Sequence, residues 1–288
     1  MNVYAWNIKF NGMAHCRDWN LNLNLQKKFD CVLSRDQVNK VIKNFRDSVS
    51  IGAYCDQDAI DQVNPQVART AASIVKPFIF LYVLKNRGKF HNMVQTEDIK
   101  LTDDTILRYF KGSRISMDGL LALMTEISDN SVANYFLDRI GIDKMNQFLK
   151  EEGYPDTSFG RRFLDSDARM HGRENYTSVT DLYRLYHGII SGNLLGAEDR
   201  NLFISIMRAQ FDRSKFALYL PESIESGGKS GVLENVWNDL IFFSHNGSSV
   251  ILIGLTENLP GPIARDFLPA YSFHFIKERY PELLQDSL

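Results

Sequence analysis

The chain has 288 residues, of which 44% are hydrophobic and 24% charged, and its formal net charge is −2. These values are ordinary for a soluble globular protein with a sizeable core, built as one large domain or two interleaved ones. The balanced charge leaves no basic footprint for nucleic acid, and no stretch approaches the length of a membrane span. We therefore expect neither nucleic acid nor a membrane as a partner.

The first residues and the cysteines give no sign of export or of a metal. Residues 1–10 alternate apolar and polar side chains, without the basic start and apolar run of a secretory signal. With Met1 as the native start, we expect a cytoplasmic protein. Cys16, Cys31 and Cys55 are too widely spaced for a disulfide framework or a zinc site, and the six histidines show no paired ligand spacing. No metal or organic cofactor is expected.

Apolar periodicity divides the chain into helices and strands. In chain order it predicts a helix at 36–47, a strand at 48–55, helices at 71–84, 116–126, 131–140 and 143–152, a long loop at 154–176, helices at 179–190 and 197–208, strands at 224–233, 238–244 and 249–256, and a last helix at 263–279. The Asn246-Gly247 pair between the last two strands is typical of a hairpin turn. A helical block thus separates an early strand from a late antiparallel meander.

This order predicts an α+β fold with two lobes in one catalytic domain, 36–288. The α/β lobe would combine 36–70 with 210–288, and the all-helical lobe would cover 71–209. Residues 1–35 form an extension of unclear role. A cleft between the lobes would be the natural site for a ligand.

The first motif with chemical meaning is Ser73-Ile74-Val75-Lys76, at the start of a predicted helix. Three residues apart, Ser73 and Lys76 share one face of that helix. A serine hydroxyl needs a base to act as a nucleophile, and a neutral lysine in apolar surroundings can be that base. Taken alone, the motif fits better an ordinary N-terminal serine followed by a lysine whose ammonium reaches solvent.

A second S-x-x-K runs from Ser226 to Lys229. Its middle residues are Gly227 and Gly228, and a strand follows, so no helix would orient Ser226. We expect Ser73, rather than Ser226, to be the nucleophile.

Ser128-Asp129-Asn130 lies in a short connection between two predicted helices. Ser128 could relay a proton to a leaving group, and the Asn130 amide could hold a substrate carbonyl. The structural alternative is that Ser128 or Asn130 caps the following helix.

Lys229-Ser230-Gly231 lies on a predicted strand. The cation and hydroxyl of Lys229 and Ser230 suit a substrate carboxylate, and Gly231 would let the substrate backbone approach closely. The next amide, on Val232, could pair with the amide of Ser73 as an oxyanion hole. The alternative is a surface strand followed by a turn.

In this order, S-x-x-K, S-D-N and K-[ST]-G resemble the signature of class A β-lactamases and penicillin-binding proteins. The resemblance runs from about residue 48 to the last helix. It implies a five-stranded antiparallel sheet flanked by helices, an all-helical lobe that carries Ser73 and S-D-N, and an acyl-enzyme on Ser73. Ser73, Lys76 and Ser128 would be the catalytic residues, and Asn130, Lys229, Ser230 and Gly231 would bind substrate.

The chain departs from this family in the loop before Asn175. Class A β-lactamases carry a glutamate there that activates the deacylating water, whereas this loop looks short and its first carboxylates are Asp165 and Asp167. Glu174 lies beside Asn175, where a helix is about to begin. These three, and then His171 and Tyr176, are the candidate bases. Each has a structural alternative, such as an ion pair with a neighbouring arginine or a turn.

Three functions remain open. The leading one is a serine hydrolase or transacylase that acts on a small or peptide-like amide or ester, with an amine or alcohol as a possible acceptor. The second is a working class A β-lactamase, which would need a deacylating base in the loop. The third is a non-catalytic penicillin-binding relative that serves as a binding or sensor protein; the presence of all three motifs argues against it.

Overall fold

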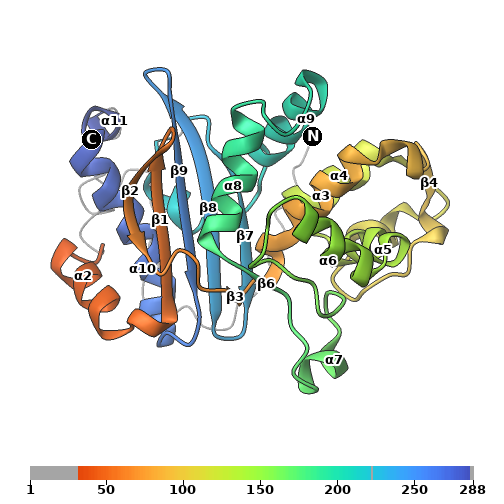
Figure 1. The fold of residues 1–288 in the computed structure, drawn as a ribbon, viewed down its shortest axis with the longest axis horizontal. Coiled ribbons are helices and arrows are strands. Elements are labelled where there is room, and N and C mark those ends of the chain that lie inside the picture. Colours follow the sequence, from red (N-terminus) through yellow and green to blue (C-terminus); the bar gives the residue numbers. More distant parts are fainter. Residues whose placement is uncertain (1–31, 222, 286–288) are drawn as a thin grey trace, which may run out of the picture.

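The computed structural model describes residues 32–221 and 223–285 and is built around one antiparallel sheet (Figure 1). Its strand order is β2-β1-β9-β8-β7. The strands are β1 (Val49–Cys55), β2 (Asp58–Val63), β7 (Gly227–Leu233), β8 (Val236–His245) and β9 (Ser248–Thr256). Because β7 ends the order, one of its edges is free for other contacts.

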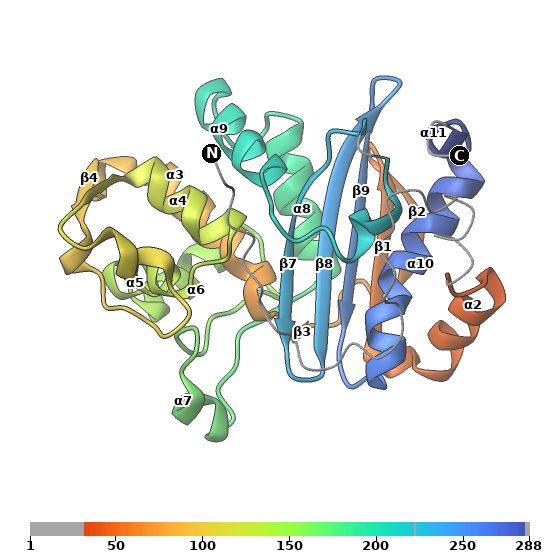
Figure 2. The same ribbon diagram turned by 180° about the vertical axis from the view of Figure 1, so that it is seen from behind.

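Helices cover both faces of this sheet (Figures 1 and 2). On one face lie α2 (Arg35–Asn44) and α10 (Gly261–Arg279), with α11 (Glu282–Gln285) against α10. On the other face lie α8 (Val179–Ile190) and α9 (Ala197–Arg208). Alternate residues of β8 serve the two cores, because Leu240 and Phe242 pack with one cluster and Ile241 and Phe243 with the other.

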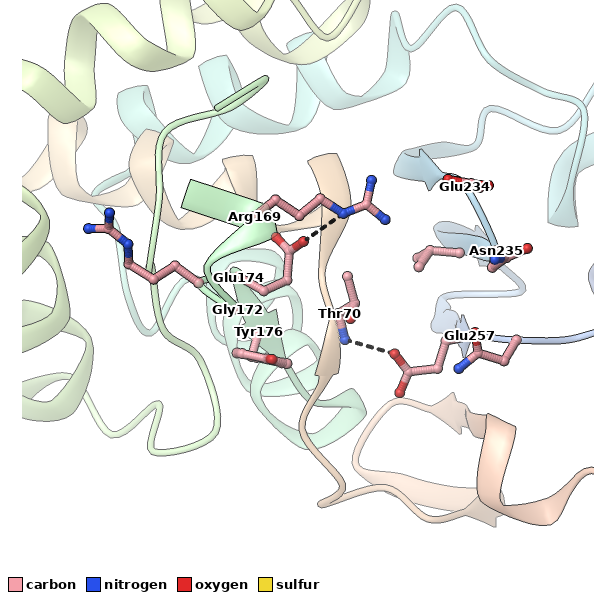
Figure 3. Close-up of a pocket in the computed structure, with 11 residues that line it drawn as sticks. Thr70, Arg169, Gly172, Glu174, Tyr176, Glu234, Asn235 and Glu257 are labelled. Atoms are coloured by element: carbon pink, nitrogen blue, oxygen red, sulfur yellow. Dashed lines mark hydrogen bonds and ion pairs between the residues drawn. The ribbon is translucent and has the colours of Figure 1, made fainter. Parts of the chain in front are cut away.

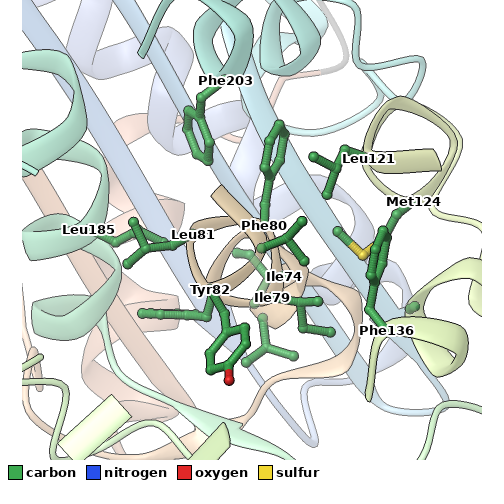
Figure 4. Packing of buried hydrophobic residues seen from close by; sticks show 14 of the residues in the cluster. Ile74, Ile79, Phe80, Leu81, Tyr82, Leu121, Met124, Phe136, Leu185 and Phe203 are labelled. Carbon is green, nitrogen blue, oxygen red and sulfur yellow. The ribbon is translucent and has the colours of Figure 1, made fainter. Parts of the chain in front are cut away.

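The second lobe is built around α3. Its helices are α3 (Lys76–Lys85), α4 (Met117–Glu126), α5 (Asn130–Ile140), α6 (Ile142–Glu151) and α7 (Ser166–Met170). Every residue from Lys76 to Leu84 is buried, and Figure 4 shows Phe80 and Leu81 packed among side chains from α4, α5, α8 and α9. The apolar helix α3 therefore joins this lobe to the rest of the molecule by packing in a shared core.

Short elements complete the chain. The small strands are β3 (Arg69–Thr70), which pairs with β6 (Tyr176–Thr177), and β4 (Met93–Gln95), which pairs with β5 (Arg114–Ser116). The 3₁₀ turns are η1 (Arg46–Ser48), η2 (Ala72–Val75), η3 (Arg87–Lys89), η4 (Thr96–Asp98), η5 (Ile106–Phe110) and η6 (Phe216–Tyr219). No helix in the described ranges is long and apolar enough to cross a membrane.

The predicted α+β fold is confirmed, and most predicted elements appear within a few residues of their predicted bounds. The predicted hairpin is present, with Asn246 and Gly247 both at positive φ. Strand β2 is missing from the prediction, because its sequence DAIDQV is largely polar and exposed and lacks an apolar run. The predicted loop 154–176 contains α7 and reaches into β6.

The predicted lobe boundaries need one correction. Helices α8 and α9 were assigned to the helical lobe, yet α8 packs on β1 and β9, and α9 packs on β7. Their apolar faces complete the core of the sheet. Of the predicted extension, residues 1–31 lie outside the described residues, and Ser34 begins α2 as its N-cap. Cys16 and Cys31 also fall in that undescribed part.

Candidate active site

A cavity of about 490 Å³ brings most of the predicted site residues together. Five segments line it: η2, the loop that holds Asp104, the junction of α4 and α5, the stretch 210–212 and the free edge of β7. The predicted residues among its lining are Ser73, Ser128, Asn130, Lys229, Ser230, Gly231 and Val232. Segments distant in the sequence therefore meet at one hollow.

Ser73 lies in the 3₁₀ turn η2, directly before α3, and not in the α-helix itself. The preceding residue, Ala72, has φ +50°, and Ser128 across the cavity has φ +63°. Such backbone strain in residues other than Gly, Asn and Asp is concentrated at functional sites, where packing holds it in place. The nucleophile turn is thus a constrained feature of the fold.

Gly231 lies directly against the backbone of the nucleophile turn. A Cβ atom there would lie 2.7 Å from Ile74 N, 2.9 Å from Ser73 N and 2.9 Å from Ala71 O. A side chain at this position would therefore collide with that turn. Gly231 sets the close spacing between Ser73 and β7.

The side chain of Lys76 is fully buried and reaches across to the S-D-N segment. Its Nζ lies 3.0 Å from Ser128 Oγ and 2.8 Å from Asn130 Oδ1, and it also contacts the carbonyl of Ser128. Among the described residues it makes no hydrogen bond to Ser73 Oγ. Burial, followed by repulsion from Lys229, lowers the pKa of Lys76 well below its usual value, although Asp129 and Asp104 oppose the shift.

The S-D-N segment is fixed by hydrogen bonds to its own lobe. Asp129, and not Ser128 or Asn130 as predicted, caps α5 by accepting from Val132 N. Its other carboxylate oxygen accepts from Thr105 Oγ1 at 2.7 Å. Asn130 donates from Nδ2 to Asp104 while its Oδ1 faces Lys76. Ser128 is left with its hydroxyl at the cavity and next to Lys76.

Lys229 is buried on β7 beside a group of other charges. Its Nζ donates to Ser230 O at 2.8 Å, and burial lowers its pKa to about 8, opposed by Asp212 and Asp239. Asp239, on β8, accepts from Phe216 N, and its Oδ1 has no partner among the described residues. Burial raises the pKa of Asp239 to about 7. Lys215 forms an ion pair with Asp212 close to Lys229 and Asp239.

Ser226 does not resemble a nucleophile in this structure. It lies before β7, is buried, and accepts a hydrogen bond from Arg213 Nη1 at 3.0 Å. It does not line the cavity that holds Ser73. The structure thus separates the two S-x-x-K motifs as the sequence suggested.

The geometry agrees with comparisons of the whole chain. A model of the beta-lactamase enzyme family matches residues 33–269. The chain belongs to this beta-lactamase enzyme family. It is accordingly a serine hydrolase of the β-lactamase superfamily.

Individual relatives of this beta-lactamase-family chain are distant. The curated protein Beta-lactamase BRO-1 of Moraxella catarrhalis is 22% identical over 230 residues, which cover 70% of this chain and 72% of the relative. A β-lactamase structure from Sphaerobacter thermophilus superposes with a TM-score of 0.72 at 20% identity, over 85% of this chain and 98% of that one. A mutant of PBP-A in an acyl-enzyme complex with penicillin G gives a TM-score of 0.70 at 20% identity, over 84% and 96%. These structures confirm the β-lactamase/transpeptidase-like fold.

The predicted deacylation bases do not face the cavity of this beta-lactamase-family chain. Asp165 caps α7 by accepting from Ala168 N, and the exposed Asp167 lies beside His171. Glu174 is tied to Arg161 by two hydrogen bonds of 2.8 and 2.9 Å. None of these carboxylates is among the cavity's lining residues. The predicted ion pair of Asp165 or Asp167 with Arg161 or Arg162 is not made among the described residues, because Arg161 pairs with Glu174 and Arg162 with Asp138.

Glu174 and Tyr176 border a separate hollow of about 260 Å³. Figure 3 shows it between the loop that carries Arg169 and the turn that joins β7 to β8, where Glu234 and Asn235 lie. Glu174 turns toward Arg169 there. His171, the other suggested base, is exposed and contacts the backbone carbonyl of Asp167. Neither His171 nor Tyr176 lines the cavity with Ser73.

Sequence reasoning missed Phe163. Its ring centroid lies 4.7 Å from Lys76 Nζ, and the side chain is buried. Asn134 holds it there, because Asn134 Oδ1 accepts from Phe163 N at 2.8 Å and Asn134 Nδ2 donates to Phe163 O at 3.0 Å. An apolar residue gives no sequence signal of a catalytic position. In the sequence, only its position in the loop, two residues after Arg161, connects Phe163 with the site.

Proposed function

We propose that the protein is a serine acyltransferase that takes an acyl group from an amide or ester donor onto Ser73. In this proposal the acyl group passes to an amine or alcohol more readily than to water. The observation that carries the proposal is that Phe163 covers Lys76 with an apolar ring, in the loop where class A β-lactamases carry their deacylating glutamate.

The first half-reaction uses the groups that line the cavity. Ser73 Oγ attacks the donor carbonyl carbon, and its proton passes to neutral Lys76. Amide N–H groups of Ser73 and Val232 would stabilise the oxyanion. The carbonyl carbon then loses its leaving group, which takes a proton from Lys76 through Ser128 Oγ. Lys229 and Ser230 would hold a polar group of the substrate, and the Asn130 amide would hold a carbonyl.

The surroundings of Lys76 support its role as a base. Burial and Lys229 favour the neutral amine, which keeps two N–H donors and one lone pair. Two N–H groups can serve the Ser128 carbonyl and Asn130 Oδ1, and the lone pair can accept from Ser128 Oγ. To take the proton of Ser73, Lys76 must exchange one of these three contacts for Ser73 Oγ.

The second half-reaction follows the same route in reverse. An acceptor hydroxyl or amine would give its proton through Ser128 to Lys76 and attack the acyl carbon. The bond to Ser73 Oγ would then break as Lys76 returns a proton to that oxygen. Water lacks a carboxylate of the loop to activate it, because Asp165, Asp167 and Glu174 are engaged elsewhere. The acyl-enzyme should thus survive in water longer than in the presence of an acceptor.

A β-lactamase is the second candidate. The matching family model and the curated relative named Beta-lactamase BRO-1 favour it. A β-lactamase would have to hydrolyse the acyl-enzyme quickly, although the loop 154–176 contributes no carboxylate to the cavity. The lifetime of the acyl-enzyme therefore distinguishes the two functions.

The nucleophile can be tested by covalent labelling with a penicillin and with a fluorophosphonate probe. Ser73→Ala should lose all labelling, because the attacking oxygen is removed. Ser226→Ala, the matched control from the other S-x-x-K, should label like the parent protein. Equal labelling of the two variants would contradict the assignment of Ser73.

A further inference from the structure

Glu126, the last residue of α4, stands out among the cavity's side chains. Its carboxylate is half-buried and makes no hydrogen bond or ion pair with the described residues. Burial raises its pKa, with no charged neighbour to oppose the shift. A carboxylate that is partly desolvated without a partner is available to a charged ligand.

The other carboxylates in the cavity are already engaged. Asp104 accepts from Asn130 Nδ2 at 2.6 Å and from Thr102 Oγ1 at 2.7 Å. Asp212 accepts from the backbone and hydroxyl of Ser214 and pairs with Lys215. Glu126 is therefore the carboxylate with free acceptor capacity on the described wall of the cavity.

Apolar side chains border the same part of the cavity. Ile127 is 41% exposed and Phe211 is 83% exposed, and both line it. Phe211 is joined to Glu126 directly, because its N–H donates to the carbonyl of Glu126 at 3.1 Å. Exposed apolar side chains gathered at a hollow are typical of a ligand surface.

The position of Glu126 indicates which part of the substrate would meet it. It precedes Ser128 by two residues, and Ser128 Oγ contacts Lys76. In the proposed function, Ser128 carries the proton to the leaving group and from the acceptor. Glu126, Ile127 and Phe211 therefore border the side where leaving groups depart and acceptors enter.

We infer that Glu126 selects leaving groups and acceptors that carry a cationic group beside an apolar body. The ammonium would pair with the Glu126 carboxylate, and the apolar part would lie on Ile127 and Phe211. This ammonium does not react and keeps its charge throughout, so Glu126 is a specificity-determining residue. The inference rests on the proposed function, because it assigns the partner of that same site.

The test compares two esters of phenylacetic acid that differ only in charge, the choline ester and the 3,3-dimethylbutyl ester. Both leave the same acyl group on Ser73, so intact-protein mass spectrometry measures each acylation rate through one product. The ratio of the two rates in a variant is divided by the ratio in the parent protein, which cancels their intrinsic reactivities. We expect Glu126→Gln to lower the preference for the cationic ester about twofold to fivefold, as for a partly exposed ion pair.

Two further variants make the outcome specific. Glu126→Lys should lower the preference below that of Glu126→Gln, because the added charge repels the ammonium. Glu234→Gln removes the same charge in the separate hollow at the β7–β8 turn and should leave the preference unchanged. An unchanged ratio in Glu126→Gln, or an equal fall in Glu234→Gln, would overturn the inference. If neither ester acylates Ser73 in the parent protein, the proposed function fails and this inference fails with it.

Discussion

At the residue scale, the contact between Phe163 and Lys76 decides the chemistry of the site. The ring lies over the buried amine and makes its surroundings apolar, which favours the neutral form of Lys76. It cannot accept a proton, so it offers no route to an activated water. The parts needed for acylation are assembled around Ser73, whereas the loop presents an apolar ring, and not a carboxylate, to Lys76.

A carboxylate placed at position 163 should restore hydrolysis. In Phe163→Glu the carboxyl group would lie near Lys76, and we expect deacylation to speed up by about 10²-fold, the lower range for a general base. Phe163→Gln is the matched control, because it has the same shape without a base. Stopped-flow and mass measurements of acyl-enzyme decay provide the rates. Equal decay in the two variants would rule out this position as the missing base site.

The sequence could predict the residues with polar chemistry but not this one. Ser73, Ser128 and Lys229 belong to motifs whose order is informative, and the structure brings them to one cavity. Phe163 and Glu126 belong to no motif. Their roles in the site depend on which groups each side chain faces. Only the folded arrangement of the loop and of α4 supplies that information.

At the element scale, the segment from Tyr154 to Thr177 is a closed structural unit. Arg161 and Glu174 bind each other across it, and Asn175 Oδ1 accepts from the backbone amides of Gly160 and Arg161. These contacts fix the path of the chain around Phe163. The predicted catalytic role of Glu174 is thus replaced by a structural one.

This assignment predicts a loss of stability without a loss of deacylation. Glu174→Gln leaves Arg161 buried without its charge partner and should lower the free energy of unfolding by about 3 kcal/mol. The exposed carboxylate in Asp167→Asn serves as control and should change it by less than about 0.5 kcal/mol. Urea unfolding measures both values. A Glu174→Gln protein of normal stability that deacylates slowly would return Glu174 to the catalytic residues.

Elements differ in how well their sequences predict them. The bounds of α8 and α9 match the prediction, because each has an apolar face that repeats at helical spacing. Strand β2 lies at the edge of the sheet and is half-exposed, so pairing with β1 holds it there in place of an apolar pattern. Its existence follows from the fold as a whole.

At the scale of the whole molecule, the two sheet strands beside the site, β7 and β8, carry buried charges. Lys229 and Asp239 lie on neighbouring strands. Burial lowers the pKa of Lys229 and raises the pKa of Asp239, so it favours the uncharged form of each group. Such groups cost free energy in their charged forms and tie the stability of the protein to pH. The stability of strands β7 and β8 beside the site should therefore change with pH.

Asp239 gives this sensitivity a definite sign. Its pKa is about 7 in the folded protein, against an ordinary value of 3.8, so the folded state binds more protons between these values. The stability of the parent protein should therefore fall as pH rises from about 4 to 7, by up to about 4 kcal/mol through this group. Asp239→Asn should lack this part of the fall. Urea unfolding at pH 5 and 7.5 tests it, and parallel pH profiles for the two proteins would show that Asp239 does not titrate as described.

The most direct test of the central claim is the lifetime of the acyl group on Ser73 with and without an acceptor. The protein is acylated with an activated ester, freed of excess donor, and followed by intact-protein mass spectrometry in buffer alone and in buffer with an amine. The account predicts an adduct that persists in buffer and is released as the amide when the amine is added. Rapid loss of the adduct in buffer alone, at a rate that the amine does not change, would contradict the account and favour a hydrolytic β-lactamase.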